Sequence, residues 1–252
     1  MVALFPIHGL PLIQPGDPLA NLIVESMERA GQMFEQGDVL VVAQKVISKA
    51  EGRVVRLEDV QPAPEAEELA ARTEKDARLV QLILDEANEV VRVRPGLIVV
   101  EDRRGFVCAN AGIDRSNIEQ LGDGEWVALL PRDPDASAQA LRQQLKTLTA
   151  VDVAVIINDS HGRAWREGTV GVAIGLAGMP AVWDRRGDTD LTGYILQHTI
   201  LGLADEIAAA ASLLMGPAAE GVPAVIVRGL DLPRGVGTAR DLQRPRAMDL
   251  FR

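Results

Sequence analysis

The 252-residue sequence contains one cysteine, Cys108, and aromatic side chains make up only 3% of its residues. One thiol excludes a disulfide within the chain and a zinc site built from several thiolates of one chain. The scarcity of aromatics argues against a stacking surface for single-stranded nucleic acid. No apolar run approaches the roughly 18–20 residues of a membrane span, and residues 1–12 lack the basic start of a secretory signal. We therefore expect a cytoplasmic protein that does not enter membranes.

Basic residues are fewer than acidic residues: 26 Lys and Arg against 36 Asp and Glu give a net charge of −10. Such a chain lacks the phosphate-neutralising surface of a duplex-DNA binder, so we expect no nucleic-acid partner. Nucleotides stay open as ligands, because carboxylates can hold a divalent cation that in turn binds phosphate. The apolar share of 47% is that of an ordinary globular protein.

Apolar patterning predicts helices and strands that follow one another without a regular βαβ order. Helical spacing is found over residues 17–36, over 66–88 as one or two helices, and over 135–149 and 191–215. Asp135 is the predicted N-cap of the helix at 135–149. Short apolar runs predict strands at 39–43, 53–57, 97–101, 105–109, 126–130, 151–157, 170–176 and 223–228. This order favours an α+β fold of mixed sheets with packed helices over a Rossmann fold.

The sharpest candidate site is the run Asn158-Asp159-Ser160-His161-Gly162-Arg163, which directly follows a predicted buried strand. Asp159 offers a hard oxygen ligand for a divalent cation, and the Ser160 hydroxyl offers a second. Arg163 and Arg166 can hold a phosphate or a carboxylate through forked hydrogen bonds. The alternative is structural, because Asp-Ser at a strand end is also typical of a turn or a helix cap.

A second candidate segment, residues 108–117, contains one carboxylate, Asp114, and a possible ligand-binding amide, Asn117. Asp114 is a candidate metal ligand, and the alternative is an Asx turn that caps a helix. Cys108 is expected to be a small buried hydrophobe in a strand and not a nucleophile.

A third candidate segment, residues 44–52, is expected to be a loop after the strand at 39–43. Lys45 and Lys49 can meet phosphates there as point charges, whereas the alternative is a solvated charged turn. The segment lacks the Gly-rich cradle that precedes the lysine of a P-loop. The three histidines of the sequence show no metal-ligand spacing.

Taken in order, these segments resemble the coenzyme F420:L-glutamate ligases, the gamma-glutamyl ligases that add glutamate to the F420 precursor. The resemblance is carried by residues 9–13, 15–17, 37–45, 47–53, 107–114, 116–117, 130–137, 158–163, 204–208 and 227–230. It implies an α+β fold and a homodimer. We expect residues 1–232 to form a single catalytic unit, with two interleaved α+β lobes as an alternative, and residues 233–252 to form a C-terminal tail.

The resemblance also implies a reaction and a set of site residues. The γ-phosphate of GTP is expected to move onto a carboxylate of the F420 precursor, and L-glutamate then replaces it to form an amide. Two cations, Mg²⁺ or Mn²⁺, are expected, with K⁺ as a further candidate. The metal ligands carried over from the family are Asp114, Asp159 and Ser160. The nucleotide contacts carried over are Leu10, Pro11, Leu12, Ile13, Gln44, Lys45, Lys49, Asn117, Gly216, Glu220 and Gly221.

Arg163 and Arg166 are our own candidates for a catalytic clamp, inferred from their position and not from the family. Three alternative functions remain open at this point. One is a ligase that acts on a different acceptor carboxylate. A metal-dependent nucleotide hydrolase is a competing enzyme, in which water takes the place of the glutamate amine. A non-catalytic GTP-binding regulatory module is the alternative from a different class.

Overall fold

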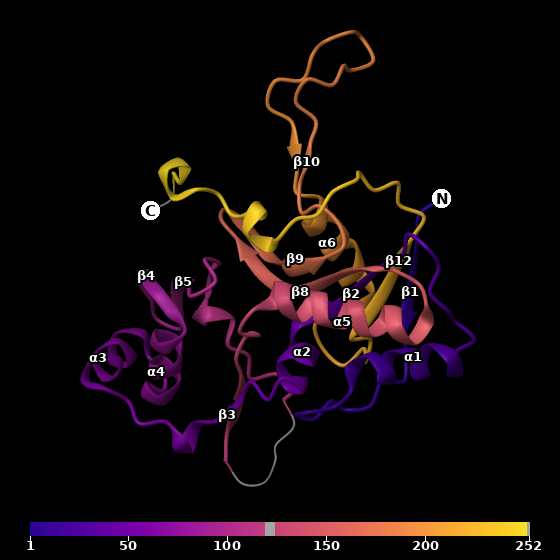
Figure 1. Cartoon of the computed structure of the whole chain (residues 1–252). Coiled ribbons are helices and arrows are strands. Elements are labelled where there is room, and N and C mark those ends of the chain that lie inside the picture. Colours follow the sequence, from indigo (N-terminus) through magenta and orange to yellow (C-terminus); the bar gives the residue numbers. More distant parts are fainter. Residues whose placement is uncertain (119–123, 251–252) are drawn as a thin grey trace.

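The computed structural model describes residues 1–118 and 124–250, and a five-stranded sheet lies at its centre (Figure 1). Its strands follow the order β1 (Ala3–Ile7), β12 (Ala224–Arg228), β2 (Val39–Ala43), β8 (Ala154–Arg163) and β9 (Arg166–Ala177). Strands β2 and β8 are parallel, and the other neighbouring pairs are antiparallel. Two parallel neighbours end at the same edge of a sheet, and that edge carries the candidate site.

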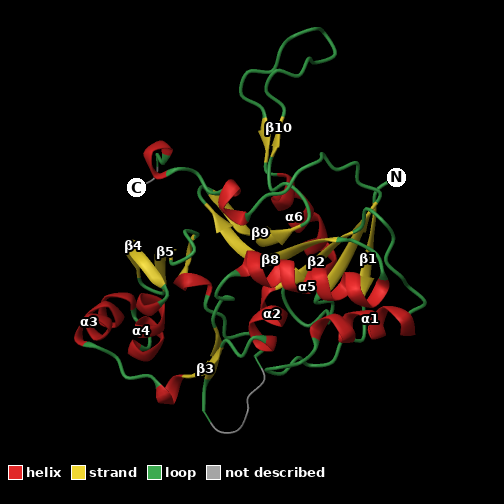
Figure 2. Ribbon diagram, in the orientation of Figure 1, coloured by secondary structure: helices red, strands yellow, loops and turns green. Residues whose placement is uncertain are grey.

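Helices cover both faces of this sheet (Figure 2). Helices α1 (Leu19–Arg29) and α5 (Pro134–Thr149) pack on the face that buries Leu40 and Val42. Helix α6 (Leu203–Met215) packs on the other face, against Val39 and Val41. Because strand β2 is covered on both sides, its sequence is a continuous apolar run without polar alternation.

A second group of elements builds a separate core beside the sheet. It consists of a 3₁₀ turn η1 (Leu57–Asp59), helices α3 (Pro64–Thr73) and α4 (Ala77–Asp85), and the antiparallel strands β4 (Ala87–Arg94), β5 (Leu97–Asp102) and β6 (Val107–Ala109). Val80, Ile83, Ile98 and Val100 are fully buried in this core. The remaining small elements are α2 (Gln44–Ala50), η2 (Asn110–Gly112), and a two-stranded sheet of β3 (Val54–Arg56) and β7 (Trp126–Ala128).

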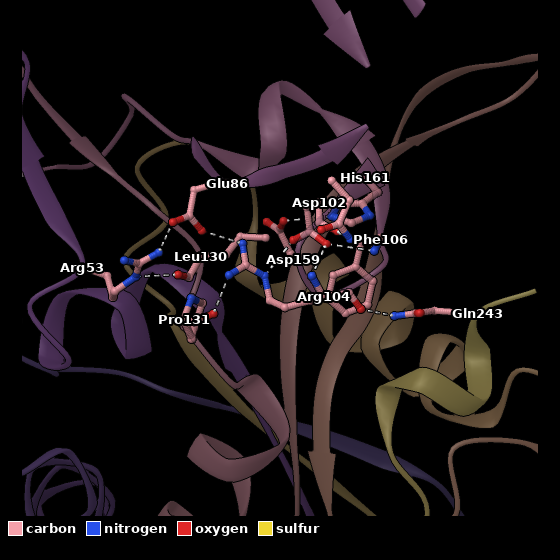
Figure 3. Close-up of polar contacts among 11 residues, drawn as sticks. Arg53, Glu86, Asp102, Arg104, Phe106, Leu130, Pro131, Asp159, His161 and Gln243 are labelled. Carbon is pink, nitrogen blue, oxygen red and sulfur yellow. Dashed lines mark hydrogen bonds and ion pairs between the residues drawn. The ribbon is translucent and has the colours of Figure 1, made fainter. Parts of the chain in front are cut away.

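An ion-pair network joins this second core to the central body (Figure 3). The Glu86 carboxylate accepts hydrogen bonds from Arg53 at 2.8 Å and from Arg104 at 3.0 Å. The same two guanidinium groups donate to main-chain oxygens, Arg53 to Leu130 at 3.0 Å and Arg104 to Pro131 at 3.2 Å. All three charged side chains are mostly shielded from solvent, at 11–13% exposure.

An arm projects from the body between β10 (Trp183–Asp184) and β11 (Ile200–Leu201), the two short strands that form its stem (Figure 1). The helix predicted over 191–215 is therefore wrong in its first part, since α6 begins at Leu203. Gly193 turns the chain with a φ of +91°, and the Asp190 carboxylate accepts the main-chain N–H groups of Thr192 and Tyr194. These local bonds favour a turn over a helix.

The α+β prediction is confirmed, with several differences at the ends of elements. The predicted helix at 17–36 is shorter, and the segment 66–88 holds two helices before it enters β4. Helix α5 is capped by Asp133, whose carboxylate accepts from Ala136 N at 2.9 Å. Asp135 instead accepts the main-chain N–H groups of Leu176 and Ala239, and so ties the 3₁₀ turn η3 (Ala239–Leu242) to the body.

Two corrections bear on the site. Residues 44–50 form helix α2, where the sequence predicted a loop. Strand β8 continues through Arg163, so the run from Asn158 to Arg163 lies within a strand and not after one. A further 3₁₀ turn, η4 (Arg246–Met248), lies near the end of the described chain. None of the helices in the described residues is both long and apolar enough to cross a membrane.

Candidate active site

A cavity of about 820 Å³ opens at the edge of the sheet where β2 and β8 end side by side. Its lining comes from the loop after β1, helix α2, the segment after η2, strands β8 and β9, and the loop after α6. Every site residue predicted from the sequence lines this cavity except Glu220, Arg163 and Arg166. The fold therefore brings together segments that lie more than 200 positions apart.

The pairing of β2 with β8 explains why these segments meet. Ala43, the last residue of β2, lies opposite Asn158 in the parallel register. After Ala43 the chain turns into α2, so Gln44 and Lys45 stand beside Asn158 and Asp159. The register with β9 shifts between Ile157 and Asn158. Such a bulge changes the direction of the side chains that follow it.

Asp114 has two polar side-chain partners on the wall of the cavity, Gln44 and Lys45. Its Oδ2 atom accepts a hydrogen bond from Gln44 Nε2 at 2.9 Å and lies 3.4 Å from Lys45 Nζ. Lys45 Nζ also donates to Ser116 Oγ at 2.8 Å. Burial raises the pKa of Asp114, Lys45 opposes the shift, and the charge of Asp159 adds to it. The two candidate metal ligands thus line one cavity.

Gln44 has a role that the sequence did not predict. The side chain is 2% exposed, and its Oε1 atom accepts a hydrogen bond from the buried Ser48 hydroxyl at 2.9 Å. A buried chain of hydrogen bonds thus runs from Ser48 through Gln44 to Asp114. Fully satisfied polar chains of this kind hold a functional side chain in one orientation. The nucleotide contact expected of Gln44 stays a prediction.

Asp159 is held at both of its carboxylate oxygens. Oδ1 accepts from the main-chain N–H of Ser160 at 2.8 Å, and Oδ2 lies 3.0 Å from Nε2 of His161 (Figure 3). Burial lowers the pKa of His161, but the hydrogen bond and the charge of Asp159 outweigh burial and raise it. Asp159 and His161 share strand β8 two positions apart.

The donor set fits a hard divalent cation that also binds an anionic substrate. No group of three or more His, Cys, Asp or Glu side chains suited to a metal occurs in residues 1–118 and 124–250. The cavity offers the carboxylates of Asp114 and Asp159 and the hydroxyl of Ser160. Asn158 Oδ1 adds a buried oxygen with no hydrogen-bond partner in the described structure. Mg²⁺ is commonly held by one or two carboxylates, with substrate phosphates and water completing its shell.

The loop after α6 closes one side of the cavity. Gly216 ends the helix at a φ of +63°, and a Cβ atom there would lie 2.1 Å from Cδ of Glu220. Glu220 Oε2 accepts from Ala218 N at 2.8 Å, so this side chain stabilises the loop from within. Asn117 Nδ2 donates to Ala218 O at 2.9 Å and connects the loop to the segment after η2.

The two candidate clamp residues lie apart from the cavity. Arg163 and Arg166 pair with each other beside the turn that closes the β8–β9 hairpin, and both residues are exposed. Arg163 donates to the main-chain oxygen of Glu167 at 3.3 Å. Their proposed contact with substrate therefore stays a prediction that this placement does not support.

Sequence reasoning missed several residues that line or support the cavity, namely Ser116, Asn158, Gly171 and Ser212. Ser116 and Asn158 lie inside the motifs already singled out, so proximity to Asp114 and Asp159 was the available signal. Cys108 is buried in β6, which confirms the prediction of a small buried residue in a strand, and burial raises the pKa of its thiol.

An α+β fold with carboxylates, lysines and hydroxyls around one cavity is typical of an enzyme that acts on small anionic substrates. The family model described as F420-0:Gamma-glutamyl ligase matches residues 9–229. The chain belongs to this family of ligases, which confirms the resemblance read from its motifs.

Three relatives illustrate the similarity, each named coenzyme F420:L-glutamate ligase. The protein from Methanothermobacter thermautotrophicus is 48% identical over 253 residues, covering 100% of this chain and 99% of the relative. The Methanopyrus kandleri protein is 51% identical over 253 residues, covering 98% of this chain and 97% of the relative. The Methanosarcina mazei protein is 39% identical over 247 residues, covering 98% of this chain and 93% of the relative. The similarity thus extends over whole chains.

Proposed function

We propose that this protein joins L-glutamate to the F420 precursor, F420-0, through an amide bond, with GTP as the source of free energy. Membership of the ligase family over residues 9–229 supports the reaction class. The observation that carries the site assignment is the meeting of Asp114 and Asp159 on one cavity with the residues expected to contact nucleotide. These two aspartates lie on different elements and come together only in the fold.

The chemistry proceeds in two transfers. A carboxylate oxygen of F420-0 attacks the γ-phosphorus of GTP, the bond to the β-phosphate oxygen breaks, and GDP leaves. The amine nitrogen of L-glutamate then attacks the acyl carbon of the acyl phosphate. Inorganic phosphate leaves with the former carboxylate oxygen, and the surplus amine proton passes to solvent. The first step makes the carboxyl carbon reactive, because phosphate is a far better leaving group than oxide.

Different residues of the cavity would bind the cations and the nucleotide. Asp114, Asp159 and Ser160 would hold two Mg²⁺ or Mn²⁺ ions, and K⁺ is a further candidate ligand of the site. Such cations supply charge neutralisation for phosphates during transfer. Lys45 and Lys49 line the same wall and provide point charges for the triphosphate. The 10–13 segment and Asn117 complete the nucleotide contacts that we propose.

We further propose that two copies of the chain associate through the arm. Leu191, Tyr194 and Ile195 are 107%, 60% and 53% exposed near its tip. Several large apolar side chains exposed within five positions of one arm are typical of an interaction surface. A second copy is the partner that the family resemblance implies.

The direct test incubates the protein with F420-0, GTP, L-glutamate and Mg²⁺ and follows the acceptor by mass spectrometry. The expected result is a gain of one or more glutamyl units. An F420-0 sample with ¹⁸O in its carboxylate should deliver one ¹⁸O atom to the released phosphate. Glutamate addition without ¹⁸O in phosphate would contradict the acyl-phosphate step alone.

The same assay separates the alternative functions. A nucleotide hydrolase releases phosphate from GTP when neither acceptor nor glutamate is present. A regulatory module binds GTP and leaves it intact in the complete mixture. Either result, with no glutamyl product, would contradict the proposed ligase.

A further inference from the structure

We infer that His161 is a positioning residue, which holds the Asp159 carboxylate in the orientation that binds a divalent cation. The inference rests on the proposed function, in which Asp159 is a metal ligand, and it adds a residue that the metal assignment does not include. Its basis is the hydrogen bond between His161 Nε2 and Asp159 Oδ2 at 3.0 Å, inside a site where both side chains are mostly buried, at 15% and 11% exposure.

The two hydrogen bonds of Asp159 restrict its carboxylate and leave lone pairs on both oxygens for a cation. An ionised carboxylate has about four lone-pair positions, two on each oxygen. The Ser160 N–H occupies one position on Oδ1, and the His161 ring occupies one on Oδ2. With a donor on each oxygen the carboxylate cannot rotate about its Cβ–Cγ bond without losing a bond. One lone pair on each oxygen stays available beside the cavity that Asp159 lines.

The His161 ring is itself held by the neighbouring core. Its centroid lies 6.4 Å from that of Phe106, at an interplanar angle of 72°, an edge-to-face contact. Phe106 is fixed by Asp102, which accepts the Phe106 N–H at 2.9 Å and donates its own N–H to Phe106 O at 2.9 Å. Asp102 is fully buried. Figure 3 shows these residues side by side, with Asp159 and His161 next to the Asp102 turn.

This chain of contacts gives His161 two separable properties. One is a donor nitrogen directed at Asp159, and the other is an aromatic ring that packs on Phe106. Removal of a residue that hydrogen-bonds to a metal ligand typically weakens metal affinity by about 10–100-fold. A purely structural histidine would act through its ring and would leave metal affinity unchanged in a folded variant.

Two substitutions separate the donor from the ring. His161→Gln keeps an N–H donor near the position of Nε2 and loses the ring, whereas His161→Phe keeps a ring and loses the donor. The probe is Mn²⁺ alone, titrated without nucleotide and followed by electron paramagnetic resonance. We expect His161→Phe to weaken Mn²⁺ binding about 10–100-fold and His161→Gln to stay within about threefold of wild type.

Further readouts keep the result interpretable. Thermal unfolding followed by circular dichroism confirms that each variant is folded, and His161→Met supplies a second donor-free variant if His161→Phe does not fold. The rate of glutamate addition should fall more in His161→Phe than in His161→Gln. In His161→Phe the Mn²⁺ concentration for half-maximal rate should rise more than the KM for GTP.

The positioning role alone would be overturned if folded His161→Phe bound Mn²⁺ with wild-type affinity. It would also be overturned if His161→Gln and His161→Phe lost the same share of Mn²⁺ affinity. Asp159→Asn distinguishes this from a failure of the proposed function. Unchanged Mn²⁺ binding in Asp159→Asn, or no binding by the wild type, would overturn the metal assignment and the role of His161 with it.

Discussion

The side-chain amide of Asn117 donates a hydrogen bond to the main-chain oxygen of Ala218 at 2.9 Å, across 101 positions of sequence. The two residues belong to two different segments that line the same cavity, the segment after η2 and the loop after α6. The bond is exposed, so it contributes little to the free energy of unfolding. Its consequence is to hold the two segments at a fixed separation where we propose that GTP binds.

Removing this bond should weaken GTP binding more than it slows turnover. Asn117 has a φ of +57°, a conformation that glycine adopts without strain. We expect Asn117→Gly to raise the KM for GTP about fivefold, since one hydrogen bond contributes about 1 kcal/mol, with kcat changed less than twofold. Asn117→Ala loses the same bond but adds backbone strain, so it should show the same KM and a lower melting temperature. Steady-state kinetics would contradict the bridging role if KM stays at the wild-type value.

Gly171 is the second position where the cavity depends on a close approach. A Cβ atom there would lie 2.0 Å from Ser212 Oγ, 2.6 Å from Asn158 Oδ1 and 2.7 Å from the main-chain oxygen of Ala208. We expect Gly171→Ala to push α6 away from β9 and to lower the free energy of unfolding by about 1–3 kcal/mol. Urea denaturation measures this change.

Gly162 supplies the matched control, because it lies on the neighbouring strand and a Cβ atom there meets nothing within 4 Å. Gly162→Ala should leave stability within about 0.5 kcal/mol of wild type, as surface changes usually do. Adding Ser212→Ala to Gly171→Ala should restore only part of the loss, because the Ala208 main-chain oxygen still lies too close. Equal stabilities of the two glycine variants would refute the close-packing argument.

Glu86 makes stability depend on pH. Burial raises the pKa of Glu86, but the hydrogen bonds and charges of Arg53 and Arg104 outweigh burial and hold the pKa below its ordinary value of 4.5. A carboxylate with a lowered folded-state pKa stabilises the fold at pH values above the unfolded pKa. This stabilisation is lost as the pH falls below 4.5 and through the folded-state value.

Glu86→Gln should therefore lower stability at pH 7 by about 3 kcal/mol, since removal of one partner from a buried ion pair costs about 3–5 kcal/mol. The difference from wild type should shrink as the pH is lowered through 4 and below. Glu125→Gln is the matched control, because Glu125 pairs with Arg115 at 3.0 Å with both side chains more than 40% exposed. Urea denaturation at pH 7 and at acidic pH tests both variants, and a pH-independent difference for Glu86→Gln would count against the ion-pair account.

The parts of the fold that could be predicted are those where burial alone sets the pattern. The strand at 39–43 was predicted with the bounds of β2, because a strand covered on both faces is a continuous apolar run. The arm was missed, since Leu191 and Ile195 have helical spacing and only the turn at Gly193 reveals the hairpin. Apolar periodicity alone does not reveal whether a segment packs against a core or projects away from it.

The site could be predicted in its residues but not in its contacts. The motifs around Asp114 and Asp159 pointed to metal ligands, yet their proximity depends on the parallel register of β2 and β8. The bond from Gln44 to Asp114 spans 70 positions, and no local pattern encodes such a distance. Arg163 and Arg166 were chosen for charge and nearness in sequence, but the hairpin carries them away from the cavity.

The arm gives the last prediction, on association of two copies. Leu191 and Ile195 expose apolar surface near the tip of the arm, whose stem is the short strand pair β10–β11. We expect the wild type to elute with twice the chain mass of 27.1 kDa in size-exclusion chromatography with light scattering. The double variant Leu191→Ser and Ile195→Ser should shift to the mass of one chain, because the apolar contact is lost while every core residue stays in place. Met33→Ser, which alters another apolar side chain at 73% exposure, should keep the wild-type mass. A monomeric wild type, or a double variant that still elutes as a dimer, would show that the arm does not join the two copies.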